Sequence, residues 1–117
     1  RKIDLELTKE VLKDFTIDKN RHFTIPNIIK IVAGYYRIKV TDIKSKRRTR
    51  DISEPRQIAM FLCREHTKSS LPEIGRQFGG KDHTTVIFSY KKISKIVKEN
   101  KELQTTILEI IDLIEKG

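Results

Sequence analysis

Four consecutive polar residues, Asp82, His83, Thr84 and Thr85, are the strongest candidates for chemistry in this chain. An Asp side chain can accept a hydrogen bond from the amino group of cytosine, and Thr offers a methyl group to thymine or a hydroxyl to a base edge. None of the four is needed for the apolar pattern that begins at Val86. The cluster therefore indicates a helix start that contacts DNA bases in the major groove; the alternative is a capping Asp82 followed by plain surface.

The second candidate is the basic run Lys46-Arg47-Arg48-Thr49-Arg50. The chain has 117 residues and a formal net charge of +9; residues 23–51 hold eight basic and two acidic side chains, whereas residues 82–117 are neutral overall. A short basic run can be a solvated loop, but this concentration favours contact with a polyanion. In that case the basic run supplies affinity, and the neutral segment supplies most of the specificity.

Catalytic and ligand-binding alternatives find little support. Residues 75–82 match the phosphate-binding pattern GxxxxGK, but Asp82 stands where that pattern needs Ser or Thr, and a predicted helix precedes it rather than a strand. Cys63 and His66 lie one helical turn apart, without a second pair at metal-ligand spacing. We therefore predict no enzyme activity, no metal site and no cofactor in this chain.

The elements that would position these residues are helical almost throughout, because Gly and Pro are few and apolar residues rarely alternate with polar ones. Thr24 and Ser53 are predicted N-caps, with Pro26 and Pro55 in the first turns that follow. A short helical turn is expected over residues 41–45, just before the basic run. The N-terminal segment predicts a short helix near residues 8–14.

The segment after residue 69 predicts a helix-turn-helix. Ser70 and Glu73 form a capping box that opens a helix of about two turns, and Gly79-Gly80 ends it. Gly75 within that helix is expected to let another helix approach closely. A longer helix then starts after Asp82, so the polar cluster lies at the position from which such motifs contact bases.

Two apolar stripes follow, Val86-Tyr90-Ile93-Val97 and Leu103-Ile107-Ile110-Ile114. Asn100 and Gln104 interrupt the pattern, which favours two separate helices packed on the domain over a coiled coil. Cys63 falls on an apolar helix face and is predicted to be a core residue. A single Cys and the lack of long apolar runs predict an intracellular chain without a membrane span, and the first residue, Arg1, suggests part of a longer protein.

Longer motifs carry a family resemblance. Leu71-Pro72-Glu73-Ile74-Gly75, followed by Phe78-Gly79-Gly80-Lys81-Asp82-His83-Thr84-Thr85-Val86, resembles the signature of the C-terminal DNA-binding domain (domain IV) of the DnaA family of bacterial replication initiators. Residues 45–50 and 55–57 resemble its basic loop and the following helix, and residues 24–44 resemble its first helices. The resemblance covers about residues 23–117, and residues 1–17 resemble the end of the preceding AAA+ ATPase region.

The resemblance implies a compact all-α domain with a Trp-repressor-like helix-turn-helix over residues 23–117. Residues 1–22 would form the end of the AAA+ region and an N-terminal connecting helix. The polar stretch over residues 18–22 suggests in addition that residues 1–17 act as a hinge. The implied function is sequence-specific binding of double-stranded DNA at DnaA boxes of a replication origin, by a monomeric, non-enzymatic domain in the bacterial cytoplasm at the nucleoid. ATP, Mg²⁺ and other protomers would bind the missing domains. The alternative is a helical protein-interaction module whose basic loop binds an acidic partner.

The resemblance also implies roles for single residues. Asp82, His83, Thr84 and Thr85 would lie in the major groove, and Arg48 would read the width of the minor groove. Contacts with the DNA backbone would come from Lys46, Arg50, Arg56, Gln57, Arg64, Thr67, Leu71, Pro72, Lys81 and Lys92. Lys81 stands where many members have Arg, so it keeps the charge but not the planar fork.

Overall fold

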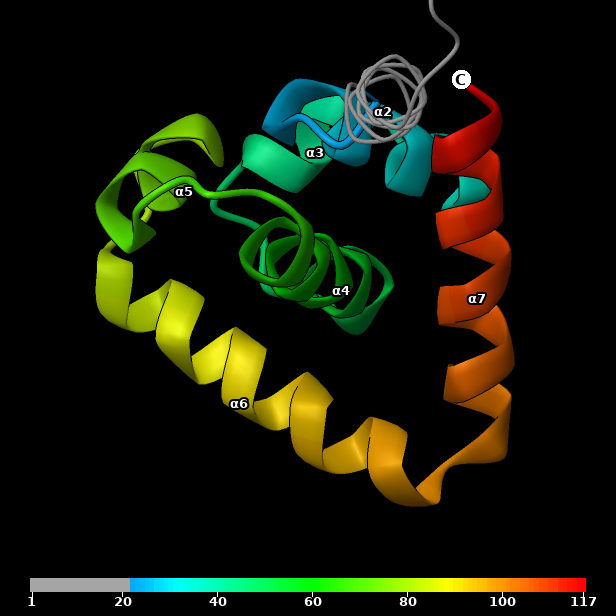
Figure 1. Cartoon of the computed structure of the whole chain (residues 1–117). Helices are drawn as coiled ribbons and strands as arrows, with labels where there is room; N and C mark the ends of the chain where they lie inside the picture. Colours follow the sequence, from blue (N-terminus) through cyan, green and yellow to red (C-terminus); the bar gives the residue numbers. More distant parts are fainter. Residues whose placement is uncertain (1–21) are drawn as a thin grey trace, which may run out of the picture.

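The computed structural model describes residues 22–117, which form six helices and no strand (Figure 1). The helices are α2 (Ile25–Tyr36), α3 (Val40–Lys44), α4 (Arg50–His66), α5 (Leu71–Gln77), α6 (His83–Glu99) and α7 (Lys101–Lys116). The predicted all-α class is therefore confirmed for this part of the chain. The helix expected near residues 8–14, and the connecting segment expected over residues 1–22, lie outside the described residues except for His22.

Short polar side chains begin most of the helices, as the sequence predicts. Thr24 accepts a hydrogen bond from the backbone N–H of Asn27 (3.3 Å), and Ser70 accepts one from Glu73 (3.3 Å). The other half of the predicted capping box is replaced: the Glu73 carboxylate accepts from Gln77 (2.8 Å) and pairs with Arg76 instead of reaching back. The hydrogen bond accepted by the Ser70 side chain is therefore sufficient to begin α5, without the second bond of the capping box.

Helix α4 begins one turn earlier than the sequence suggests. Thr49 is its N-cap, so the prediction that Ser53 caps this helix with Pro55 in the first turn is wrong. The cause is Ile52, whose side chain is only 1% exposed, so burying it extends the helix towards the N-terminus. Pro55 then lies inside the helix, where it removes one backbone hydrogen bond. Residues 45–49 remain as a connection between α3 and α4, which we call the basic loop.

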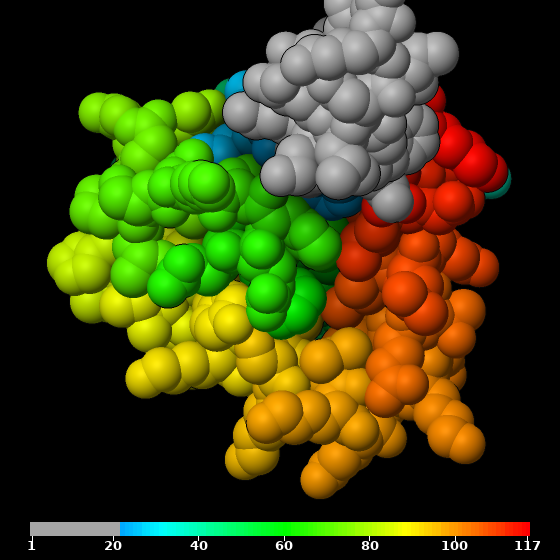
Figure 2. Space-filling view, in the orientation of Figure 1, coloured from blue at the N-terminus to red at the C-terminus, as the bar shows by residue number. Residues whose placement is uncertain are grey.

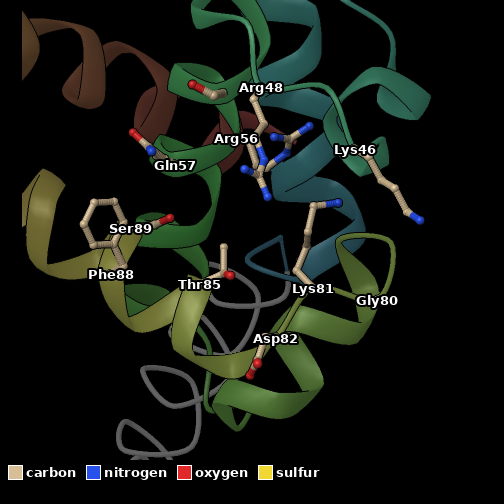
Figure 3. Close-up of a pocket in the computed structure, with 11 residues that line it drawn as sticks. Lys46, Arg48, Arg56, Gln57, Gly80, Lys81, Asp82, Thr85, Phe88 and Ser89 are labelled. Atoms are coloured by element: carbon tan, nitrogen blue, oxygen red, sulfur yellow. The ribbon is translucent and has the colours of Figure 1, made fainter.

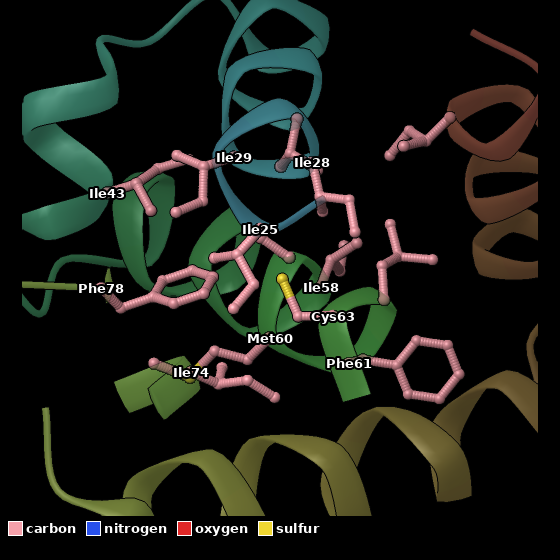
Figure 4. Close-up of a cluster of buried hydrophobic side chains, with 14 of the residues drawn as sticks. Ile25, Ile28, Ile29, Ile43, Ile58, Met60, Phe61, Cys63, Ile74 and Phe78 are labelled. Atoms are coloured by element: carbon pink, nitrogen blue, oxygen red, sulfur yellow. The ribbon is translucent and has the colours of Figure 1, made fainter. Parts of the chain in front are cut away.

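Helix α4 forms the centre of the fold and is viewed nearly end-on in Figure 1. It packs against α2 and α3 on one side and against α6 on the other, and it also contacts α5. The fully buried side chains include Ile28, Ile43, Met60, Ile74 and Phe78, drawn from α2, α3, α4, α5 and the end of α5 (Figure 4). Cys63 is among them, as predicted, and burial raises the pKa of its thiol.

The two C-terminal helices meet at Asn100, which ends α6 and caps α7 by accepting from the N–H of Leu103 (3.0 Å). Helix α7 turns back and packs against α2 and α6, so two separate helices replace the coiled coil that the sequence left open. Side chains fill the space between the ribbons of α6 and α7 in the space-filling view (Figure 2). The apolar stripe of α7 is therefore used inside the domain.

Candidate nucleic-acid interface

The turn between α5 and α6 is held by close backbone approaches. Gly79 has a φ of 86°, and a Cβ there would lie 2.0 Å from the carbonyl oxygen of Lys44 at the end of α3. A Cβ on Gly75 would lie 2.2 Å from the carbonyl oxygen of Lys81, so this glycine accommodates the turn rather than the second helix that the sequence suggests. The helix-turn-helix is thus packed tightly both against itself and against α3.

The start of α6 presents the polar cluster to the surface. Asp82, His83, Thr84 and Thr85 are all exposed, and the core begins directly after them at the fully buried Val86. The Asp82 carboxylate caps the helix by accepting from the N–H of Thr84 (3.2 Å). The sequence prediction of a capped helix whose first turn is free of core contacts is therefore confirmed.

A groove of about 550 Å³ separates the basic loop from α6 (Figure 3). Figure 3 shows Arg48 and Arg56 on one side of it, Thr85 and Asp82 along α6 on the other, and Lys81 pointing towards the arginines. Seven of the residues predicted to contact DNA line this groove: Lys46, Arg48, Arg56, Gln57, Lys81, Asp82 and Thr85. One surface thus joins the two features that the sequence identified separately.

The cations near the basic loop differ in what they can still bind. Arg47 lies 3.7 Å from carboxylate oxygens of both Asp42 and Asp51, and Arg50 lies 3.5 Å from Glu54. Lys46 and Arg48 are exposed, and neither forms an ion pair with a carboxylate in the described part of the chain. The two side chains of this loop that are free for an external anion are therefore those that line the groove.

Arg56 occupies a different place from that expected of a residue in direct contact with DNA. The residue is 6% exposed, and its guanidinium donates to the backbone oxygens of Ile43 (2.7 Å), Arg47 (2.7 Å), Asp42 (3.1 Å) and Ser45 (2.9 Å). Burial lowers the pKa of this group. Four acceptors among residues 22–117 thus face its five N–H donors, so its hydrogen-bonding capacity is almost fully used.

Lys81 is committed in the same way. Its ammonium donates to the backbone oxygens of Ser45 (2.7 Å), Phe78 (2.9 Å) and Lys44 (3.1 Å). Burial lowers the pKa of Lys81, and the neighbouring charges of Arg56 and Lys46 lower it further. An ammonium has three N–H donors, so all of them have partners here.

The remaining predicted positions lie around the groove rather than in it. A neighbouring depression between α4 and α6 is lined by Arg50, Gln57 and Lys92. Thr67 donates to the backbone oxygen of Cys63 (2.7 Å) at the end of α4. Other predicted positions outside the groove are His83 and Thr84 at the α6 start, the exposed Arg64 over the ring of Tyr90, the half-buried Leu71 and the exposed Pro72.

Sequence reasoning missed three side chains of the groove, Ser53, Phe88 and Ser89. Phe88 is 60% exposed, an unusual position for so large an apolar ring. The sequence carried a signal for it: Phe88 lies one helical turn after Thr85 and off the Val86–Tyr90–Ile93 stripe, so it had to point away from the core. Ser53 was missed because the start of α4 was placed too late.

Metal-binding and membrane-spanning features are absent from residues 22–117. These residues contain no cluster of three or more His, Cys, Asp or Glu side chains arranged to hold a metal ion. None of the six helices combines the length and the apolar character needed to cross a membrane.

Comparison with known proteins identifies the family. Residues 25–93 match the family model described as the bacterial DnaA protein helix-turn-helix. The chain is 47% identical over 117 residues to the chromosomal replication initiator protein DnaA of Geobacter sulfurreducens, and 52% identical over 108 residues to that of Caldanaerobacter subterraneus subsp. tengcongensis. These matches cover 100% and 92% of the chain but 25% and 24% of the relatives, so the chain spans about a quarter of their length. The chain therefore belongs to the DnaA family, and residues 25–93 form its helix-turn-helix region.

Proposed function

We propose that this chain binds double-stranded DNA sequence-specifically, at DnaA boxes of a replication origin. The observation that carries the proposal is the groove between the basic loop and α6, because it brings exposed polar side chains of the α6 start to one surface with two cations, Lys46 and Arg48, that have no carboxylate partner within residues 22–117. The family membership gives the proposal its biological setting, a replication initiator. The domain doing this would be residues 23–117, joined through residues 1–22 to an AAA+ region outside the chain.

The two walls of the groove suit two neighbouring grooves of a duplex. We infer that Asp82, His83, Thr84 and Thr85 enter the major groove at the N-terminus of α6, as helix-turn-helix motifs do. Arg48 would enter the adjacent minor groove and respond to its width and A·T content. Neighbouring DNA grooves are separated by one sugar–phosphate strand, so the space between α6 and the basic loop would hold that strand.

Contacts with the phosphates would come from the exposed cations around the groove. Lys46, Arg50, Arg64 and Lys92 are exposed, and Gln57 connects the groove with the neighbouring depression. We assign backbone contacts to these five residues and to Thr67, Leu71 and Pro72, which lie at or near the junction of α4 and α5. The charges of Arg56 and Lys81 would attract the same strand, although their N–H donors are largely or fully used.

The wider setting follows from the family. The domain would act as a monomer on each box, without catalysis and without a cofactor of its own, in the bacterial cytoplasm at the nucleoid. ATP, Mg²⁺ and contacts with other initiator protomers would belong to regions outside this chain. The protein-interaction alternative loses its main support, because Ile107, Ile110 and Ile114 of its proposed apolar stripe are buried within the domain.

A pair of binding measurements tests the proposal. The affinity of the 117-residue chain is compared for a duplex with a DnaA box and for a scrambled duplex of the same composition, at near-physiological salt. Specific proteins typically prefer their site by about 10³-fold or more, and we expect a ratio of that order. Equal affinities would refute specific recognition, because phosphate contacts alone do not distinguish sequences.

A further inference from the structure

We propose that Arg56 and Lys81 act as positioning residues that fix the basic loop, and with it Arg48, relative to α6. The two cations together hold six backbone oxygens, those of Asp42, Ile43, Lys44, Ser45, Arg47 and Phe78. We call this arrangement the cation clasp. The inference rests on the proposed function, because it concerns how the DNA-reading residues are held.

The clasp joins three segments that are distant in the sequence. Arg56 extends from α4, Lys81 from the turn before α6, and both donate to the Ser45 oxygen at the start of the basic loop, at 2.9 and 2.7 Å. The Lys81 contact spans 36 residues of sequence. A loop bonded at Ser45 both to α4 and to the turn before α6 has little freedom to move relative to either.

The end of α3 explains why two cations can be held together. The last carbonyl groups of a helix lack partners within it and carry partial negative charge. The oxygens of Asp42, Ile43 and Lys44 belong to the last turn of α3, and all three accept from the clasp. Two positive groups that are buried side by side repel each other, and their burial is unfavourable without compensation. The six carbonyl oxygens that accept hydrogen bonds from them supply this compensation.

The number of N–H donors that are already used distinguishes a positioning role from direct contact with DNA. The three N–H groups of Lys81 all have protein acceptors, so a phosphate could bind this ammonium only by displacing one of them. Arg48, in contrast, has no carboxylate partner among the described residues and lines the same groove. The clasp therefore holds the loop while Arg48 remains available to DNA.

A fixed loop matters because a contact made by a disordered side chain loses the entropy of ordering it on binding. If the clasp preorganises Arg48, loss of the clasp should reduce the contribution of Arg48 to DNA affinity and leave the contacts made by α6 in place. The expected energetic coupling is therefore between Lys81 and Arg48, two residues for which the structure gives no direct hydrogen bond.

The first experiment uses the free protein and needs no DNA. Hydrogen exchange measured by NMR compares the wild-type chain with Lys81→Met, which keeps an unbranched side chain, one heavy atom shorter, and removes its N–H donors. The amides of Ser45 and Arg47, bonded to Asp42 O and Ser45 Oγ, report on the loop. We expect them to exchange about tenfold faster in the variant, while amides in the middle of α4 are unchanged. Unchanged exchange at Ser45 and Arg47 would overturn the clasp, whatever the protein does with DNA.

The second experiment is a double-mutant cycle on the DnaA-box duplex with Lys81→Met and Arg48→Ala. We expect Lys81→Met to weaken binding about tenfold in the wild-type background and less than about twofold when Arg48 is already absent. The slope of the logarithm of the binding constant against the logarithm of the salt concentration is the salt slope. Equal losses of affinity in both backgrounds, with a salt slope reduced in magnitude by about 0.9, would show that Lys81 instead contacts a phosphate directly. Failure of the wild-type chain to prefer the box would refute the proposed function and leave the exchange result standing.

Lys92→Met is the matched control, since Lys92 is an exposed lysine of α6 that does not line the groove and has no part in the cation clasp. Lys92→Met should reduce the salt dependence of binding, and its loss of affinity should add to that of Arg48→Ala. The hydrogen exchange of the Ser45 and Arg47 amides should stay unchanged. Arg56→Lys is the second clasp variant, because it keeps the charge but can fill at most three of the four acceptors. It should show the same faster exchange at Ser45 and the same dependence on Arg48; exchange and binding equal to wild type would count against the proposal.

Discussion

The carboxylate of Asp82 lies 3.0 Å from the imidazole of His83, from Oδ1 to Nδ1, and the same oxygen accepts the N–H of Thr84 at 3.2 Å. One atom therefore caps α6 and contacts the ring beside it. This double use links the stability of α6 to the placement of a side chain that we assign to the major groove.

Substitution of Asp82 should show how much its cap contributes to the stability of the fold. Asp82→Ala removes the cap and should lower the free energy of unfolding by about 0.5–2 kcal/mol, whereas Asp82→Asn keeps a capping side chain and should stay within about 0.5 kcal/mol of wild type. Urea denaturation followed by circular dichroism measures both. Equal stability of Asp82→Ala and the wild type would show that this cap is dispensable.

Thr85→Ala should affect sequence discrimination, because Thr85 is exposed at the α6 start and lines the groove. We expect a loss of about 1–3 kcal/mol on the DnaA-box duplex and little change on the scrambled duplex. Lys46→Ala is the contrasting variant: it should weaken both duplexes alike and reduce the salt slope by about 0.9. If the two variants lose affinity in the same pattern, our division between reading and charge is wrong.

Phe88 should contribute to binding although it contributes little to folding. Its ring is 60% exposed and lines the groove, so DNA would bury apolar surface against it. Phe88→Ala should weaken box binding by about 1 kcal/mol or more and leave the urea midpoint nearly unchanged. The control is Leu108→Ala on α7, which is 66% exposed and outside the groove, and should change neither quantity. Equal affinities for Phe88→Ala and the wild type would remove Phe88 from the interface.

Three glycines should respond differently to the same change to Ala. Gly34 lies inside α2 with nothing within 4 Å of the place that an added Cβ would take, so Gly34→Ala should stabilise by about 0.5–1 kcal/mol. Gly80 has a φ of 77° but open space around it, so Gly80→Ala should cost about 1–2 kcal/mol. Gly79→Ala should cost more than Gly80→Ala, since its Cβ would also meet the Lys44 oxygen at 2.0 Å. Thermal or urea unfolding gives the order, and a reversed order of Gly79 and Gly80 would contradict it.

Acid should weaken the fold through His66, whose ring stacks on Phe23 with centroids 4.7 Å apart. Partial desolvation of its ring lowers the pKa of His66 below its ordinary value of 6.5, and this outweighs the opposite effects of Glu65 and Glu115. The unfolded chain then binds the proton more tightly, so the free energy of unfolding should fall as the pH falls below about 6.5. His66→Phe keeps a stacking ring without a titrating group, so its urea midpoint should fall less between about pH 7 and 5.5. An identical pH profile for the variant would refute this.

Most of the helices and their first residues could be predicted from the sequence, because helix caps and apolar spacing act locally. Thr24, Ser70 and Asp82 begin helices at positions that the sequence indicated, and Asn100 lies where the apolar pattern indicated an interruption. The start of α4 was misplaced because local rules favour a Pro in the first turn, whereas the burial of Ile52 depends on packing that the sequence does not display.

The site was predictable in its parts but not in its contacts. Spacing alone indicated an exposed α6 start and charge alone indicated the basic loop, and these two features line one groove. The burial of Arg56 could not be foreseen, because it depends on carbonyl groups 9 to 14 residues earlier in the chain. An arginine next to a basic run looks the same in sequence whether it faces solvent or the end of a helix.

The close backbone approaches at Gly75 and Gly79 have a consequence for redesign. The position of α6 depends on backbone atoms that tolerate no added carbon, whereas Thr85 and Phe88 project from it as exposed side chains that neither the core nor the helix cap constrains. The sequence preference that we propose could therefore be retuned by exchanging those two side chains on an unchanged scaffold. Selection for new specificity should accumulate substitutions at the two projecting positions and leave the two glycines untouched.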